Sequence, residues 1–197
     1  MDYSILEEFE NELCNYTAAS YCVLTDSCTH ALELCFRYNN IMGSIFLPSR
    51  TYISAVMVLH KLGIEPRFFN YDWDFEYEYG CSKIWDSARG FRENMYRSGH
   101  MQCLSFGHTK RLEIGHGGAI LLDDQDAYRT LKRMAYDGRD LSIRPWQNQV
   151  DWSVGYHYNM RLEDAAKGIE MLKTNKLKSM ESQRVEYPDV SKLKIQV

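Results

Sequence analysis

Apolar and polar positions along the chain follow two periods, one typical of strands and one typical of helices. Short apolar runs predict buried strands, and apolar residues spaced three and four apart predict amphipathic helices. The predicted strands are residues 21–24, 44–48, 65–70, 82–86, 101–106 and 118–123, and the predicted helices are residues 2–14, 25–39, 49–62, 124–138 and 160–183. Strands that alternate with helices indicate an α/β domain.

This order predicts a three-layer α/β/α fold with a mainly parallel sheet. The sequence has no internal repeat and no low-complexity linker, so we expect a single domain over residues 1–183 that ends in a long C-terminal helix. Residues 184–197 are polar, and we expect them to form a tail that packs little against the domain.

The stretch "YDWDFEYEY" (71–79) alternates aromatic and acidic residues at period 2. As a strand, it would place its aromatic side chains on one face and its carboxylates on the other. We interpret it as an edge strand or flap that packs on the core. An aromatic wall that faces a substrate is the alternative.

Composition and charge exclude several classes of protein. A net charge of -4 and a pI near 5.9 argue against nucleic acid or an anionic membrane as the main partner. No apolar run approaches the ~18 residues of a membrane span, and the acidic amphipathic start is unlike a targeting peptide, so we expect a cytoplasmic protein. The six cysteines and six histidines lack metal-ligand spacing, so we expect no metal.

Three polar features lie at positions where α/β proteins bind ligands. The turn 25–29 leads into a helix, whose N-terminal N–H groups suit a phosphate. Asp86 ends a predicted strand, at the edge of the sheet where ligands bind. Lys110 lies in a polar turn, after Ser105 and before Gly117. Each feature alone also has an ordinary explanation, as a helix cap, a turn residue or a solvated lysine.

The order of these features is that of pyridoxal 5′-phosphate (PLP) enzymes, and longer stretches carry a more specific resemblance. Four stretches resemble motifs of the DegT/StrS-type sugar aminotransferases: "FLPSRTYISAVMVLHKLGIEPRFFN" (46–70), "IWDSA" (84–88), "LSFGHTKRLEIGHGGAILLDD" (104–124) and "GYHYNMRLEDAAKGIEML" (155–172). The resemblance spans residues 21–36, 46–69, 83–90 and 103–176. It implies a reduced form of the fold-type-I PLP-dependent transferase large domain, with PLP as the cofactor.

The resemblance also implies roles for individual residues around the ring of the cofactor. Lys110 would form the internal aldimine and then act as the general base that moves a proton. Asp86 would pair with the pyridine nitrogen and keep it protonated. Tyr52 matches the aromatic position that stacks on the ring. Arg89 replaces a usual glutamine, and it would pair with the cofactor's O3′, with an acidic substrate group, or with a structural partner.

Other residues match the positions that hold the phosphate of the cofactor. Ser105 would bind it together with Ser27, Cys28 and Thr29, where Cys28 takes the place of a typical glycine. Asn159 matches an asparagine that reaches the phosphate of the neighbouring subunit, which implies a homodimer with a shared site. His157 occupies the position where other members place that asparagine. The resemblance assigns no role to His108 and His116.

The implied function is a PLP-dependent aminotransferase that moves an amino group from glutamate or glutamine to a keto acceptor, by analogy a nucleotide-linked keto-sugar. The chain is short for the family, both between residues 70 and 82 and after the predicted helix 160–183, and the missing parts help to build the substrate pocket. Two alternatives therefore remain. One is a PLP-binding protein with little transaminase activity, and the other is a different PLP reaction on an amino acid. A related dehydratase branch has histidine in place of the lysine, which Lys110 argues against.

Overall fold

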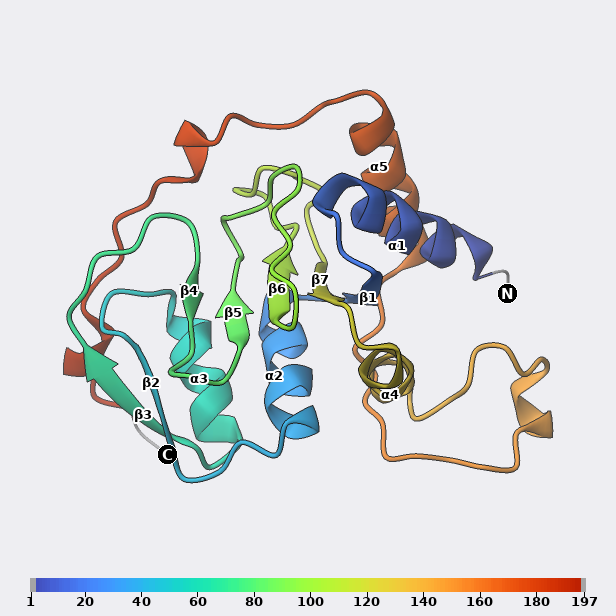
Figure 1. Cartoon of the computed structure of the whole chain (residues 1–197), viewed down its shortest axis with the longest axis horizontal. Coiled ribbons are helices and arrows are strands. Elements are labelled where there is room, and N and C mark those ends of the chain that lie inside the picture. Colours follow the sequence, from blue (N-terminus) through green and yellow to red (C-terminus); the bar gives the residue numbers. More distant parts are fainter. Residues whose placement is uncertain (1–2, 196–197) are drawn as a thin grey trace.

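The computed structural model describes residues 3–195, and its helices and strands follow the order predicted from the sequence (Figure 1). Positions 2, 196 and 197 of the predicted first helix and tail lie outside the described residues. The strands are β1 (Tyr21–Thr25), β2 (Ser44–Pro48), β3 (Glu65–Phe69), β4 (Tyr77–Glu78), β5 (Ile84–Asp86), β6 (Met101–Ser105) and β7 (Gly118–Leu122). The α-helices are α1 (Ser4–Thr17), α2 (Cys28–Tyr38), α3 (Ile53–Lys61), α4 (Gln125–Ala135) and α5 (Leu162–Lys173).

The central sheet has the strand order β1-β7-β6-β5-β4. Its β5–β6 pair is parallel, whereas the β1–β7, β6–β7 and β4–β5 pairs are antiparallel. The α/β class is confirmed, but within the described residues the pairing differs from the mainly parallel sheet that we expected. Parallel neighbours need a crossover connection, usually a helix. The short connection from β4 to β5 and the helix-free connection from β6 to β7 lead to antiparallel neighbours, whereas the long loop 87–100, also without a helix, carries the chain from β5 to its parallel neighbour β6.

Strands β2 and β3 form a separate parallel pair, with α3 as their crossover. Strand β4 lies between this pair and β5 (Figure 1), and the N–H of Gly80 donates to the carbonyl of Phe46 in β2 at 2.8 Å. Within the stretch 71–79, only Tyr77–Glu78 forms a strand, at the edge of the sheet. Tyr77 and Tyr79 are fully buried there, as expected for an edge strand that packs on the core.

Helices pack against the sheet to give the expected three layers. On one side, the thiol of Cys35 in α2 lies 3.6 Å from that of Cys103 in β6. On the other side, Phe9 of α1 contacts the ring of Phe106, just past β6, at 5.7 Å between centroids. Helices α1 and α5 lie side by side (Figure 1). No helix within residues 3–195 is both long and apolar enough to cross a membrane.

The C-terminal helix is shorter than the predicted helix 160–183, because α5 ends at Lys173. Asn175 has a left-handed backbone (φ +50°) and the N–H of Lys176 bonds back to Met171, which closes the helix. The chain then runs past the sheet to the side of β2 and β3 (Figure 1). There the N–H of Val190 donates to the carbonyl of Ser49 at 2.8 Å. We call residues 183–190 the C-terminal strap.

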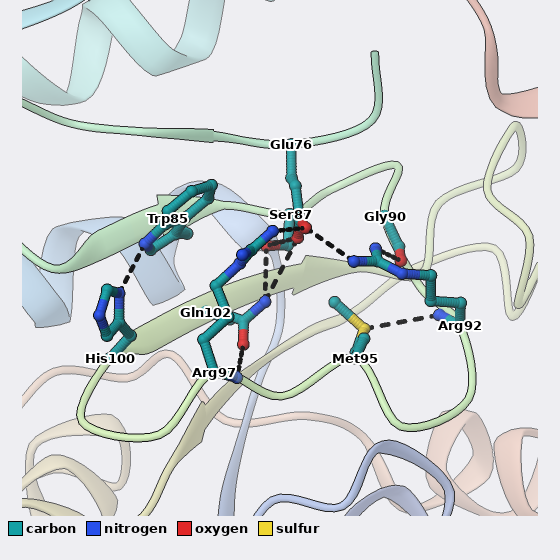
Figure 2. A network of polar contacts seen from close by, with 9 residues as sticks. All are labelled: Glu76, Trp85, Ser87, Gly90, Arg92, Met95, Arg97, His100 and Gln102. Atoms are coloured by element: carbon teal, nitrogen blue, oxygen red, sulfur yellow. Dashed lines mark hydrogen bonds and ion pairs between the residues drawn. The ribbon is translucent and has the colours of Figure 1, made fainter. Parts of the chain in front are cut away.

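The side chain of Glu76, only 8% exposed, joins the stretch 71–79 to the sheet through its carboxylate (Figure 2). One oxygen accepts hydrogen bonds from Arg92 at 2.9 Å and Arg97 at 2.6 Å. The other accepts from the hydroxyl of Ser87 at 2.9 Å and from the amide of Gln102 at 3.3 Å. Because Ser87 follows β5 and Gln102 lies in β6, Glu76 fixes its segment against two of the strands that end at the cavity described below.

We expect Glu76→Gln to lower the free energy of unfolding by about 2 kcal/mol at pH 7, because two guanidinium groups lose the charge that they bind. Burial alone would raise the pKa of Glu76, but hydrogen bonds from Arg92 and Arg97 outweigh it and hold that pKa below its usual range. The stabilisation is therefore complete above the pKa of the unfolded chain, about 4.3, and is lost as the pH falls through the lower folded pKa.

Urea unfolding of both proteins between pH 3 and pH 7 measures this difference. Glu93→Gln is the matched control, because Glu93 is exposed. Equal unfolding free energies for Glu76→Gln and Glu93→Gln at pH 7 would contradict the assignment.

Candidate active site

A cavity of about 650 Å³ opens where β1, β5 and β6 end and the next segments begin. All but one of the residues proposed from the sequence line it: Ser27, Cys28, Thr29, Tyr52, Asp86, Arg89, Ser105 and Lys110. The exception is Asn159. The structure therefore brings together residues that lie in four separate stretches of the sequence.

The N-terminus of α2 forms one wall of the cavity. The side chain of Ser27 caps this helix and accepts from the N–H of His30 at 3.2 Å. The hydroxyl of Thr29 donates to Ser54 at 2.8 Å. Cys28 is the first helical residue, so it does not need the left-handed backbone that would favour glycine. A helix N-terminus with hydroxyl groups around it suits a bound phosphate.

Gly118, at the start of β7, allows the sheet to approach this helix closely. A Cβ atom there would lie 2.5 Å from the backbone nitrogen of Cys28 and 2.8 Å from the carbonyl oxygen of Leu104. Both are backbone atoms, which cannot move aside without a shift of α2 or β6. The position of the helix N-terminus is thus fixed by contact between backbones.

Asp86 ends β5 with its carboxylate buried. One oxygen accepts from the N–H of Ala88 at 3.0 Å, and the other accepts from the hydroxyl of Tyr77 at 3.2 Å. Burial raises the pKa of Asp86, while the Ala88 N–H and the charge of Lys110 act against this shift. The carboxylate is held in one orientation by two donors that come from different segments.

Lys110 lies half-buried in the connection between β6 and β7, where its N–H donates to the carbonyl of Gly107 at 2.9 Å. Burial lowers the pKa of Lys110, and the nearby guanidinium of Arg89 lowers it further, whereas Asp86 acts in the opposite direction. No described residue forms a hydrogen bond with its Nζ atom. A lower pKa raises the fraction of uncharged amine at neutral pH, which is the nucleophilic form.

Aromatic side chains that the sequence left unassigned complete the cavity. Trp73 and Phe75, from the stretch 71–79, line it beside Tyr52. The period-2 aromatic pattern had suggested such a wall only as the alternative, and the structure shows that the stretch supplies both an edge strand and part of the cavity. Val185, Tyr187 and Pro188 of the C-terminal strap line it too, although their polar surroundings in the sequence gave no signal of this.

Asn159 and the histidines left unassigned lie outside the cavity. Tyr158, next to Asn159, stacks on His30 of α2 at 3.7 Å between ring centroids. His157 is exposed and lies 3.1 Å from the carboxylate of Asp137. His108 and His116 are exposed. None of these side chains joins the group around Lys110.

Comparison with solved structures shows a shared fold. A 3-amino-5-hydroxybenzoic acid synthase has 16% identity and a TM-score of 0.69, with 86% of this chain and 56% of that chain covered. A DegT DnrJ EryC1 StrS aminotransferase from Brucella abortus has 19% identity and a TM-score of 0.68, with 86% and 59% covered. DesI, crystallised in the presence of its TDP-sugar product, has 18% identity and a TM-score of 0.68, with 88% and 54% covered.

The chain therefore spans between 54% and 59% of the length of these three proteins. A search of curated proteins found no match. The sequence does match one protein family over residues 1–81 and 77–192, which together include nearly all of the described residues. The motifs around Asp86 and Lys110 lie within these ranges, and the fold agrees with the match. The chain belongs to the DegT/DnrJ/EryC1/StrS aminotransferase family.

Proposed function

We propose that this chain is a PLP-dependent aminotransferase that takes an amino group from glutamate or glutamine and passes it to a keto acceptor. One observation carries the proposal: a lysine with a lowered pKa, a buried aspartate and a helix N-terminus line the same cavity. Its volume of about 650 Å³ is in the range of cofactor and small-molecule sites. Membership of the family supports the same reaction class.

The residues present fit the phosphate and the ring nitrogen of PLP. Ser27, Thr29 and the free N–H groups at the start of α2 suit the phosphate. Gly118, which has no Cβ atom, allows β7 to lie close to this helix N-terminus. When bound, PLP supplies an electron-withdrawing ring that stabilises negative charge on the substrate carbon. The chain's own task is to attach, orient and protonate that ring, and Ser105 and Tyr52 line the cavity beside these groups.

Lys110 and Asp86 would divide the proton transfers between them. The uncharged amine of Lys110 would attach the cofactor and, once released by the amino donor, take a proton from one carbon and return it to another. Asp86 would hold a proton at the ring nitrogen, because a buried carboxylate favours a cationic partner. The Ala88 N–H and the Tyr77 hydroxyl keep it aimed in one direction.

The acceptor that we propose is a keto-sugar, with or without a linked nucleotide, by analogy with DesI and its TDP-sugar product. The aromatic side chains of Trp73 and Phe75 at the cavity give apolar surface on which a sugar or base can pack. Mass spectrometry of the products formed from several keto-sugars identifies the acceptor.

We expect PLP to become fixed to Lys110 when the loaded protein is reduced with borohydride. Lys110→Arg keeps the positive charge but offers no amine, so it should bind PLP without covalent attachment. Peptide mass spectrometry locates the label. Lys178→Ala is the control, because Lys178 pairs with Glu113 outside the cavity. A label on another lysine, or none on the natural protein, would refute the proposal.

We expect glutamate or glutamine, added without an acceptor, to convert the lysine-linked cofactor to its aminated form. Asp86→Asn should slow this conversion by about 100-fold, because the amide does not hold a proton at the ring nitrogen. Stopped-flow absorbance measures both rates. If PLP attaches to Lys110 but no amino donor changes the spectrum, the chain is a PLP-binding protein rather than a transaminase.

We also propose that the chain forms a homodimer in which Asn159 serves the partner's site, since it does not line its own cavity. Lys110→Arg and Asn159→Ala variants should each be inactive alone. When they are mixed, unfolded and refolded together, about one quarter of the sites should regain both residues. Activity assays of the mixture measure this recovery. A mixture that stays as inactive as its components would show that Asn159 does not act across subunits.

A further inference from the structure

Arg89 is a buried cation on the wall of the cavity, with 8% of its surface exposed. Its Nε–H donates to the hydroxyl of Tyr187 at 2.6 Å, and one terminal N–H donates to the carbonyl of Gln183 at 3.2 Å. Both acceptors are uncharged. Within residues 3–195, no carboxylate forms an ion pair with Arg89.

A buried guanidinium is costly unless an anion balances its charge. Two of its five N–H donors are used by Tyr187 and Gln183, and the side chain is among those that line the cavity. The carboxylate of Asp86 lies near enough for its charge to interact with that of Arg89, but it accepts its hydrogen bonds from the N–H of Ala88 and the hydroxyl of Tyr77. The cavity is therefore lined by a cation that has Asp86 as a nearby charge but forms no hydrogen bond or ion pair with a carboxylate of residues 3–195.

The C-terminal strap keeps the two neutral acceptors of Arg89 in place. Gln183 is fully buried, and Val190 is tied to Ser49 at the other end of the strap. Between them, the ring of Tyr187 stacks on Trp73 at 5.7 Å between centroids. The hydroxyl of Tyr187 is thus held against Arg89 by contacts on both sides, at the border of the cavity.

We propose that Arg89 binds a carboxylate of the amino donor, and that Tyr187 is the acceptor that occupies the guanidinium when no donor is bound. The proposal rests on the proposed function and assigns the residues that recognise the carboxylate of its amino donor. A carboxylate accepts two parallel hydrogen bonds from a guanidinium and balances its charge, so it replaces the single phenol oxygen favourably. Tyr187 then competes with the substrate carboxylate for Arg89 and so sets the affinity for the amino donor.

The test is binding of glutarate, a dicarboxylate without an amine, to the PLP-loaded protein by calorimetry. Arg89→Gln should weaken glutarate binding by about 10- to 100-fold, and Tyr187→Phe should strengthen it, because the competing acceptor is gone. Glutaramide, the uncharged diamide, should bind weakly to all three proteins. Arg184→Gln is the matched control, because Arg184 lies in the same strap but pairs with Asp74.

PLP affinity and borohydride labelling of Lys110 are measured on the same samples. If PLP labels Lys110 and Arg89→Gln binds glutarate as tightly as the natural protein, this inference fails while the proposed function stands. If Arg89→Gln loses PLP affinity but not glutarate affinity, Arg89 serves the cofactor and the inference is overturned. If Arg89→Gln does not fold, the Tyr187→Phe variant tests the proposal alone. Glutarate binding that is unchanged or weaker in Tyr187→Phe would contradict competition between Tyr187 and a carboxylate for Arg89.

Discussion

A carboxylate that is taken out of water has to be hydrogen-bonded or paired with a cation, and the walls of the cavity meet this requirement for Asp86. Asp86 accepts hydrogen bonds from the N–H of Ala88, just after β5, and from the hydroxyl of Tyr77 in β4. Lys110 and Arg89 add positive charge nearby. The segments that close around the cavity are therefore also the segments that make a buried aspartate tolerable.

The stretch 71–79 performs this task in place of longer elements. Glu76 ties it to β5 and β6, Tyr77 reaches Asp86, and Trp73 borders the cavity. Within the stretch, the acidic Glu76 binds polar groups of the sheet, whereas the aromatic Trp73 and Tyr77 line the cavity and the core. One side chain anchors the segment through charge while the next packs against the core or the cavity.

Much of the fold could be predicted because the spacing of apolar residues is a local property. Eight of the residues that line the cavity could be named from the sequence because they lie in short contiguous motifs, whereas Trp73, Phe75 and Tyr187 could not. The directions of the strands could not be predicted, since they depend on how the long loops without a helix cross the sheet and on where β4 packs. The position of the C-terminal strap against the cavity could not be predicted either. Tyr187 lies in a polar stretch without periodicity, and its place is set by Arg89, 98 residues earlier in the chain.

The antiparallel pairing of β4 with β5 has a consequence for how the chain folds. Tyr77 pairs with Asp86 only nine residues away, whereas β1 and β7 join residues almost a hundred positions apart. Contacts between residues close in sequence cost less loop-closure entropy and form sooner than distant ones. We therefore expect the hydrogen bond that orients Asp86 to arise within a local hairpin, so that half of the site's acid–base pair is organised before the sheet is complete.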